Sequence, residues 1–143
     1  RLSEDDYVII HDAARPIVYQ DIIDDLIEKA KANGNACSAV SCYETVVLTE
    51  NRTSGKEQID RNRIVRVQTP QCYNYGLIKS LYEKADKDNR EDFVYANILA
   101  MNYGVEIYFS KGTNNNIKIT TKDDIALFRA LLYYINNAEG EEN

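Results

Sequence analysis

Residues 7–16 read YVIIHDAARP, and this stretch decides which fold class the sequence predicts. The apolar run Tyr7–Ile10 is typical of a short strand buried on both faces, as in a parallel sheet. Residues His11–Pro16 would then follow the carboxyl end of the strand, which is the edge where open α/β sheets bind ligands. We therefore expect both the sheet and the site to be organised around residues 7–16.

A helix is predicted directly after this stretch. Apolar side chains recur at helical spacing between Gln20 and Asn33, and Gly34 supplies a C-terminal stop. Strand, loop and helix together form one βα unit, which is the building block of α/β proteins.

The middle of the sequence predicts strands. Two segments, Ala36–Cys42 and Thr45–Thr49, are rich in β-forming residues. The polar stretch Glu50–Glu57 predicts a turn, and it precedes the β-branched segment Ile64–Thr69. We interpret residues 44–67 as a two-stranded β-arm inserted into the domain.

Helical periodicity returns in the second half of the chain. Amphipathic patterns predict helices over Tyr75–Ala85 and Phe93–Tyr103, with a charged linker between them. Val105–Ser110 alternates like a strand, and Asn116–Thr120 predicts a shorter strand.

A last helix is expected from Thr121 to about Tyr134. Thr121 is a suitable N-cap, and Asp123 and Asp124 lie where the positive end of a helix favours negative charge. Residues 138–143 are expected to form a disordered tail.

The order of elements predicts a single α/β domain with an inserted β-arm. A chain of 143 residues with 44% apolar residues can bury one core. Nucleotide-binding sheets usually carry a glycine-rich phosphate loop after their first strand, yet all six glycines are isolated and neither GxGxxG nor GxxxxGKS occurs. We therefore expect residues 1–143 to be the carboxyl-terminal part of one domain, truncated at its N-terminus.

Charge and composition exclude several classes of function. A net charge of -6 repels phosphate backbones, so nucleic-acid binding is not expected. Cys37, Cys42 and Cys72 are odd in number and lack metal-site spacing, and His11 is the single histidine, so neither a disulfide framework nor a metal site is predicted. No segment is apolar over enough residues to span a membrane and no signal peptide opens the sequence, so a cytoplasmic protein is expected.

Four short motifs occur together in the order and spacing of a known family. They are HDAARP at residues 11–16, DR at 60–61 followed by QTPQ at 68–71, NIKIT at 116–120, and DD at 123–124. Over Tyr7 to Tyr134 the sequence therefore resembles the cytidylyltransferases of 2-C-methyl-D-erythritol 4-phosphate and of ribitol 5-phosphate. The resemblance implies a Rossmann-like nucleotidyltransferase sheet whose β-arm clasps a second subunit in a homodimer.

The activity implied by the resemblance is transfer of CMP from CTP to a polyol phosphate, with release of pyrophosphate and with Mg²⁺ held mainly by the nucleotide. We take 2-C-methyl-D-erythritol 4-phosphate, a precursor of isoprenoids, as the first substrate candidate because HDAARP favours it. The residue types suit this chemistry. A phosphate monoester is mostly ionised near neutral pH, so the enzyme has to position it and neutralise charge.

By resemblance, Asp12 holds the polyol hydroxyls, with the Ala13 backbone and Arg15 beside it. Without the resemblance, Asp12 would be interpreted as a loop cap and Arg15 as a partner in a surface ion pair. His11 is interpreted as structural, because a lone histidine forms hydrogen bonds more often than it catalyses.

Four further residues match functional positions of the family. Thr45 and Arg61 match arm residues that reach the other subunit's site, where the arginine binds the substrate phosphate, which its fork can grip with two hydrogen bonds. Thr69 matches a threonine that contacts substrate, with Pro70 fixing a turn. Lys118 matches the lysine that meets the phosphates, so Arg61 and Lys118 are the candidate catalytic residues. The structural alternatives are a solvent-facing charge on a hairpin for Arg61 and the exposed face of a strand for Lys118.

Departures from the family pattern leave alternatives open. Residues 93–97 read FVYAN where the family begins a helix with an acidic cluster, and this favours ribitol 5-phosphate, a precursor of teichoic acid or capsule. Glu44 replaces the aspartate that the family commonly has before Thr45. The family's CTP-binding loop would precede Arg1, so these 143 residues alone are expected to be inactive, and a non-catalytic dimerisation module is a further alternative.

Overall fold

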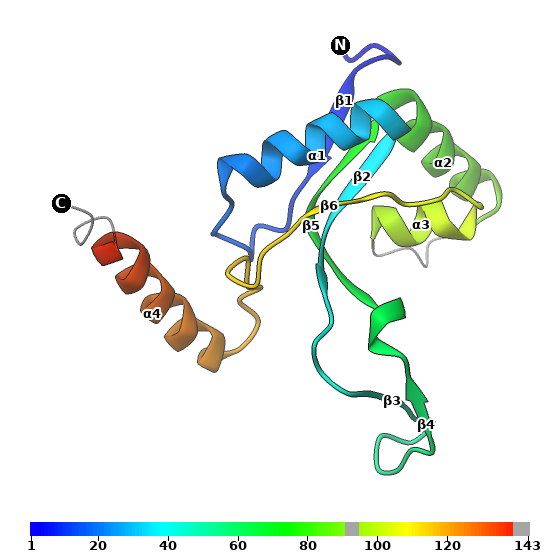
Figure 1. The fold of residues 1–143 in the computed structure, drawn as a ribbon. Coiled ribbons are helices and arrows are strands. Elements are labelled where there is room, and N and C mark those ends of the chain that lie inside the picture. The colour runs from blue at the N-terminus through cyan, green and yellow to red at the C-terminus, as the bar shows by residue number, and fades with distance from the viewer. Residues whose placement is uncertain (91–94, 139–143) are drawn as a thin grey trace.

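The computed structural model describes residues 1–90 and 95–138. Strands and helices alternate along most of this length (Figure 1). In chain order the elements are β1 (Tyr7–Ile10), α1 (Gln20–Asn33), β2 (Asn35–Ser41), β3 (Val46–Leu48), β4 (Glu57–Ile59), a 3₁₀ turn (Arg61–Arg63), β5 (Val65–Asn74), α2 (Tyr75–Lys87), α3 (Ala96–Asn102), β6 (Phe109–Lys111) and α4 (Lys122–Ala138). Two of the features predicted from sequence lie outside the described residues: the tail after Ala138, and the start of the second helix pattern at Phe93 and Val94.

The main sheet has four strands in the order β1-β5-β2-β6. β5 runs antiparallel to both of its neighbours, and only β2 and β6 are parallel. The predicted α/β class is therefore confirmed, with a mixed sheet. β5 is also the longest strand, so it aligns the elements on both of its sides.

The prediction that β1 is buried on both faces in a parallel arrangement is wrong. β1 pairs antiparallel with β5, from Tyr7 opposite Asn74 to Ile10 opposite Gln71, and lies at an edge of the described sheet. Ile9 is 43% exposed and Ile10 is 39% exposed. An apolar run predicts a strand. It does not determine whether the neighbouring strands run parallel or antiparallel to it, or how many of them there are.

A bulge interrupts the pairing of β2 with β5 at the QTPQ motif. Cys37 pairs with Gln71 and Ala39 pairs with Val67, so two steps along β2 correspond to four along β5. A bulge of this kind bends a strand and re-aims its side chains. The sequence predicted a turn at Pro70, and this is wrong, because Pro70 lies buried inside the continuous strand β5.

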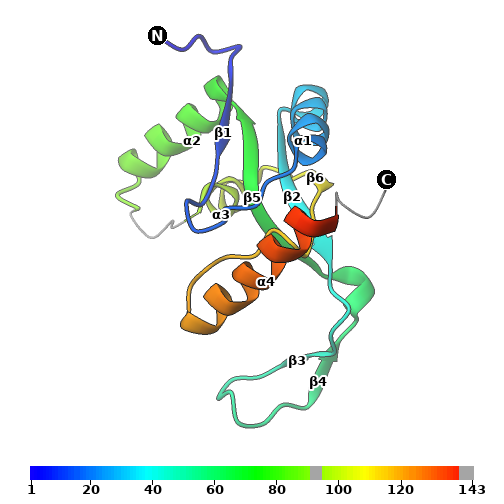
Figure 2. The same ribbon diagram turned by 90° about the vertical axis from the view of Figure 1, so that its left-hand side faces the viewer.

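Helices cover both faces of the sheet, and each face has its own apolar cluster. Figure 2 shows α1 on one side of β5 and α2 on the other. Successive side chains of a strand point to opposite faces. Cys72 therefore joins the cluster with Leu26 of α1, whereas Tyr73 joins the cluster of α2 and α3 that contains Leu99. The described core thus has three layers.

Helix α1 forms as the sequence predicts. It spans Gln20–Asn33 and ends at Gly34, which adopts the left-handed conformation with φ 84°. Glycine reaches this conformation without a Cβ clash. The Gly34 N–H donates to the Ala30 carbonyl, and the chain then enters β2 directly.

The β-arm is a separate two-stranded sheet within residues 44–67. β3 and β4 pair antiparallel from Val46 opposite Ile59 to Leu48 opposite Glu57, and the arm projects away from the main sheet (Figure 1). Its second strand, Glu57–Ile59, lies nearer the turn than predicted. Of the predicted strand Ile64–Thr69, residues 65–69 instead belong to β5, in the main sheet.

Two strand predictions near the C-terminus differ from the structure. Of Val105–Ser110, only the end joins β6 (Phe109–Lys111), because the Asn35 side chain donates to the Glu106 carbonyl and accepts from the Tyr108 N–H. These side-chain bonds occupy backbone groups that a longer ladder would use. Asn116–Thr120 forms no strand at all.

Helix α4 is longer than predicted, but its N-terminal cap is as expected. Thr121 Oγ1 accepts a hydrogen bond from the Asp124 N–H, and Asp124 accepts from the backbone N–H groups of Thr120 and Thr121. Figure 1 shows α4 set apart from the sheet, and several of its apolar side chains are exposed, including Leu127 and Tyr133. Among the described residues, no helix combines the length and apolar character that crossing a membrane requires.

Replacing Leu26 with alanine should strongly destabilise the protein. Leu26 is fully buried between α1 and the sheet, and truncating such a side chain removes apolar burial and leaves a cavity. We expect the free energy of unfolding to fall by about 2–5 kcal/mol in urea titrations. Leu2→Ala is the matched control, because Leu2 is 54% exposed, and it should change stability by less than about 0.5 kcal/mol. Equal effects of the two changes would contradict the described core.

The carboxyl group of Asp124 should titrate far below its usual range. Hydrogen bonds from the Thr120 and Thr121 N–H groups hold the pKa of Asp124 at about 2, against an ordinary value of 3.8. A lowered pKa stabilises the folded protein above pH 3.8, and this contribution disappears as the pH falls toward 2. Carbon-13 NMR of the carboxyl resonance should therefore show a midpoint near pH 2. A midpoint near 4 in the folded protein would exclude the cap.

Candidate active site

A pocket of about 290 Å³ opens beside the loop that follows β1. Its walls come from four parts of the chain that are distant in sequence. They are Asp12 and Arg15 after β1; Val67, Gln68, Thr69 and Gln71 of β5; Tyr95, Asn97 and Ile98 at the start of α3; and Lys118 between β6 and α4. The pocket therefore lies at the carboxyl end of β1, where the sequence predicted a site.

One carboxylate and two cations meet in this pocket. Lys118 Nζ lies 3.0 Å from Asp12 Oδ2, and Arg15 Nε lies 3.6 Å from the same oxygen. The hydrogen bond to Asp12 raises the pKa of Lys118 above its ordinary value, so the lysine stays charged at neutral pH. Two positive charges against one negative charge leave a net positive site, which attracts an anion such as a phosphate.

The loop that carries Asp12 is tied to the bulge of β5. The Asp12 N–H donates to Thr69 Oγ1 at 2.9 Å, and the same hydroxyl lies 3.1 Å from His11 Nδ1. His11 Nε2 lies 2.8 Å from the Arg15 carbonyl, which can only accept, so Nε2 carries a proton. In a neutral ring Nδ1 then accepts from Thr69. His11 thus has the structural role expected for it.

Asn116 fastens the Lys118 segment to the same place. The Arg15 guanidinium donates to the Asn116 carbonyl at 2.6 Å, and Asn116 Nδ2 donates to the Thr69 carbonyl at 2.7 Å. Further along the same segment, the Ile119 N–H donates to the Ala14 carbonyl. These bonds position Lys118 without a strand, so the alternative of Lys118 as the solvent face of a strand does not hold. Asn116 belongs to the NIKIT motif, but the motif alone predicts no role for its side chain.

The predicted site residues fall into two groups. Asp12, Arg15, Thr69 and Lys118 converge on the pocket. Ala13 lies exposed in the loop between Asp12 and Arg15 and does not line the pocket.

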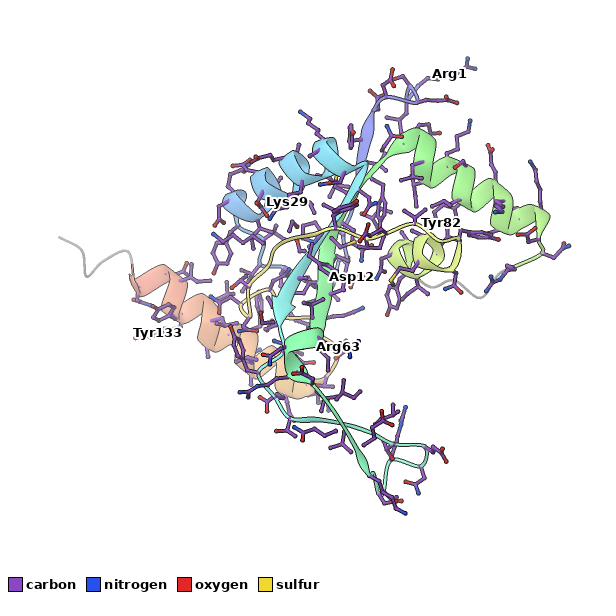
Figure 3. The ribbon with its side chains drawn as sticks, turned by 45° about the vertical axis from the view of Figure 1, so that its right-hand side comes forward. Arg1, Asp12, Lys29, Arg63, Tyr82 and Tyr133 are labelled. Atoms are coloured by element: carbon purple, nitrogen blue, oxygen red, sulfur yellow. The ribbon has the colours of Figure 1, made fainter. Side chains whose placement is uncertain are left out.

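Thr45 and Arg61 belong to the arm and are not in the pocket. Arg61 lies in the exposed 3₁₀ turn, and its guanidinium donates to the Tyr43 carbonyl at 3.2 Å. Figure 3 labels the neighbouring Arg63 at the base of the arm, below Asp12 at the main sheet. Neither Thr45 nor Arg61 therefore lines the pocket.

The structure adds residues that sequence reasoning did not select. Gln68 and Gln71 belong to the QTPQ motif. Their positions at the pocket were not predicted, because the strand pattern does not indicate the bulge that turns their side chains toward it. Tyr95 and Asn97 were noted only as departures from a family pattern. Asn97 is 6% exposed, and an asparagine at a buried position of a short amphipathic helix was a signal available in the sequence.

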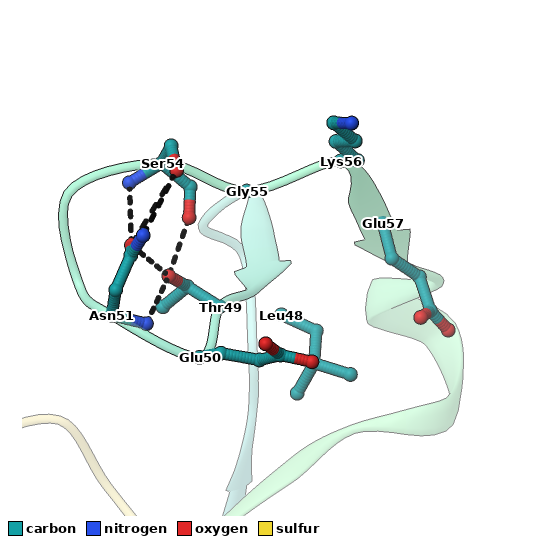
Figure 4. Close-up of a pocket in the computed structure, with 8 residues that line it drawn as sticks. All are labelled: Leu48, Thr49, Glu50, Asn51, Ser54, Gly55, Lys56 and Glu57. Atoms are coloured by element: carbon teal, nitrogen blue, oxygen red, sulfur yellow. Dashed lines mark hydrogen bonds between the residues drawn. The ribbon is translucent and has the colours of Figure 1, made fainter.

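A second hollow, of about 390 Å³, lies in the turn of the arm (Figure 4). Its shape follows from the turn itself. The Asn51 side chain accepts from the N–H groups of Thr53 and Ser54, and Thr49 Oγ1 bonds the Ser54 carbonyl. None of the predicted site residues lines it. In residues 1–90 and 95–138, no group of three or more histidine, cysteine, aspartate and glutamate side chains is placed to hold a metal ion.

Comparisons with known proteins show the family of the chain. Residues 2–134 match the 2-C-methyl-D-erythritol 4-phosphate cytidylyltransferase family. Ribitol-5-phosphate cytidylyltransferase of Lacticaseibacillus paracasei is 39% identical over 131 residues, which are 90% of this chain and 56% of that protein. The 2-C-methyl-D-erythritol 4-phosphate cytidylyltransferase of Clostridium novyi is 35% identical, over 92% of this chain and 56% of that protein.

Solved structures show the same relationship in three dimensions. The 2-C-methyl-D-erythritol 4-phosphate cytidylyltransferase of Francisella tularensis superimposes with a TM-score of 0.77 and 30% identity, over 90% of this chain and 60% of that one. The enzyme of Thermus thermophilus gives a TM-score of 0.78 at 26% identity, over 87% and 61%. This chain spans a little over half the length of the curated relatives it matches. With its mixed sheet, its arm and its Asp12–Lys118 pocket, the chain belongs to the 2-C-methyl-D-erythritol 4-phosphate cytidylyltransferase family of nucleotidyltransferases.

Proposed function

We propose that this chain is the carboxyl-terminal part of a cytoplasmic enzyme that transfers CMP from CTP to a small polyol phosphate. The observation that carries the proposal is the pocket in which Asp12, Arg15 and Lys118 meet within hydrogen-bonding and ion-pair distance. The relatives named above act on polyol phosphates according to their names. Because the chain spans only part of their length, each activity test uses the protein at the full length of its relatives.

The residues of the pocket suit the acceptor half of this reaction. An oxygen of the polyol phosphate attacks the α-phosphorus of CTP, a new P–O bond forms, and the bond to the leaving pyrophosphate breaks. The attacking phosphate is already mostly ionised at neutral pH, so no general base is needed. Lys118 and Arg15 neutralise its charge and hold it in place, while Asp12 accepts hydrogen bonds from the polyol hydroxyls.

We further propose that Mg²⁺ accompanies the nucleotide. Asp12 is the single carboxylate among the described residues that line the pocket, and Mg²⁺ commonly needs only one or two carboxylates when substrate phosphates supply other ligands. The residues present are therefore compatible with an ion held mainly by CTP. When bound, the ion would supply positive charge next to the triphosphate.

Two polyol phosphates are candidates for the acceptor. The matched family is named for 2-C-methyl-D-erythritol 4-phosphate, and this supports that compound as the acceptor. The relative at 39% identity is named for ribitol 5-phosphate, and the polar residues Tyr95 and Asn97 in the pocket wall favour this second candidate. Steady-state kinetics of the full-length protein with CTP and each polyol phosphate would separate them by the ratio of kcat/KM.

A non-catalytic dimerisation module is the alternative from another class of function. The coding sequence upstream of Arg1 discriminates between the two. A glycine-rich loop with a basic residue there supports the enzyme, and a sequence without one supports the module.

Lys118→Ala and Arg15→Ala should each lower kcat/KM in the full-length enzyme by at least about tenfold. Each change removes one charge-assisted contact to the acceptor, and the loss of such a contact corresponds to about 1.5–3 kcal/mol. Lys122→Ala is the matched control, because Lys122 is an exposed lysine at the start of α4, outside the pocket. If Lys118→Ala behaves like Lys122→Ala, then Lys118 is an ordinary surface lysine.

We also propose that two subunits share each site through the arm. Arg61 is exposed at the arm base and does not line its own subunit's pocket. Val47 is 47% exposed and Leu48 is 53% exposed, and a two-stranded ribbon cannot bury such side chains by itself. A symmetric contact with a second copy would cover them and bring Arg61 toward the other subunit's Asp12.

Complementation in trans tests this arrangement. Full-length Arg61→Ala and Asp12→Ala enzymes should each be nearly inactive. Mixed in equal amounts under conditions of subunit exchange, they should recover about a quarter of wild-type activity, because half of the dimers are mixed and each mixed dimer has one intact site. Absence of recovery despite proven exchange, or a monomer at assay concentration, would show that Arg61 does not act in the other subunit's site.

A further inference from the structure

A line of four buried polar side chains runs from the core to the pocket. Tyr73 Oη lies 3.4 Å from Cys37 Sγ and donates to Gln71 Oε1 at 2.8 Å, and Gln71 Nε2 lies 3.4 Å from Asn97 Oδ1. All four residues are at least nine-tenths buried. Gln71 and Asn97, at the outer end of the line, also line the pocket that contains Asp12.

The hydrogen bonds along this line are donated in one direction, from Tyr73 to Gln71 and from Gln71 to Asn97, and the Tyr73 hydroxyl sets this direction. Its single proton goes to Gln71 Oε1, so the Gln71 amide must turn its Nε2 toward Asn97 and the Gln68 carbonyl. Burial raises the pKa of Tyr73 and brings that of Cys37 to about 11, so both groups stay protonated at neutral pH. The direction of the line is therefore the same across the physiological range.

This direction leaves a hydrogen-bond donor at the pocket. Asn97 Oδ1 is occupied by Gln71, so the free half of the Asn97 amide is Nδ2. Among the described residues, none accepts a hydrogen bond from Asn97 Nδ2. Asn97 Nδ2 is not among the fully buried polar atoms that lack a partner, so it is open to the pocket, where an oxygen of a ligand can accept a hydrogen bond from it.

We propose that Asn97 is a specificity-determining residue that donates a hydrogen bond to a hydroxyl of the polyol chain, and that Tyr73 and Gln71 are positioning residues that orient its amide. The proposal rests on the proposed function. With the phosphate of the acceptor at the cations Lys118 and Arg15, the uncharged part of the molecule extends along the remaining wall, where Asn97 lies. Ribitol 5-phosphate has one more hydroxyl-bearing carbon than 2-C-methyl-D-erythritol 4-phosphate, so a donor on the wall away from the cations favours the longer, unbranched polyol phosphate.

The test measures kinetics of full-length wild-type and Asn97→Ala enzymes with ribitol 5-phosphate and with 2-C-methyl-D-erythritol 4-phosphate. Wild type should prefer ribitol 5-phosphate. Asn97→Ala should raise the KM for ribitol 5-phosphate about tenfold or more, change the KM for CTP less than about twofold, and lower the ratio of kcat/KM between the two acceptors. An unchanged ratio, or an equal rise of the KM for CTP, overturns the proposal.

Two further variants separate orientation from packing. Tyr73→Phe keeps the aromatic ring and removes only the donated proton, so it should lower the same acceptor ratio while thermal unfolding shows a folded protein. If Tyr73→Phe does not fold, Gln71→Glu replaces the amide that faces Asn97 and should shift the ratio in the same direction. Asn102→Ala is the control, because Asn102 is exposed on α3 and outside the pocket, and it should leave the ratio unchanged.

Binding of the acceptor separates failure of the proposed function from failure of the proposed role of Asn97. Calorimetry with ribitol 5-phosphate needs no turnover. Binding that weakens in Asn97→Ala, in a protein that transfers no CMP, would reject the proposed function and keep the role of Asn97. Turnover by wild type with unaltered acceptor preference in Asn97→Ala would keep the function and reject that role. Absence of both binding and turnover would reject both.

Discussion

The rest of the structure depends on the antiparallel pairing of β5 with β1 on one side and β2 on the other. This strand places the loop after β1 next to the QTPQ bulge, and the bulge turns the Thr69 hydroxyl toward the Asp12 backbone and His11. Without the two additional residues in β5, the pairing would continue regularly and Thr69 would keep the alternation of an ordinary strand. A local irregularity in the sheet therefore creates the floor of the pocket.

The same bulge connects the charged site with the core. On its outer side, the Thr69 carbonyl holds Asn116 and so positions the segment of Lys118. On its inner side, Gln71 links the buried Tyr73 hydroxyl with Asn97 at the pocket wall. The pocket thus has a charged end, which suits a phosphate, and a neutral amide end, which suits hydroxyl groups. Both ends are held by hydrogen bonds to one strand.

Sequence patterns correctly predicted the elements that are encoded within a few neighbouring residues. Helix α1 has the predicted bounds because apolar spacing and Gly34 are both encoded within a few residues, and the motif residues Asp12, Arg15, Thr69 and Lys118 do converge on one pocket. The failures share a cause. The burial of β1, the turn at Pro70 and the strand at Asn116–Thr120 each required knowledge of a partner from a distant part of the chain. At β6, a single side chain, Asn35, takes backbone groups that the pattern had assigned to a strand.

The amino-acid sequence alone was sufficient for the α/β class, the presence of the arm, both ends of α1 and the family, because periodicity, caps and short motifs are properties of neighbouring residues. The tertiary structure decided which side chains form the site. Asn97 counts as a departure from a motif in the sequence, and it becomes a donor at the pocket only because Tyr73 and Gln71 orient it. Thr45 and Arg61 match their motif equally well, yet they lie outside the pocket. Proximity between residues far apart in sequence is set by strand pairing and register, which local pattern does not contain.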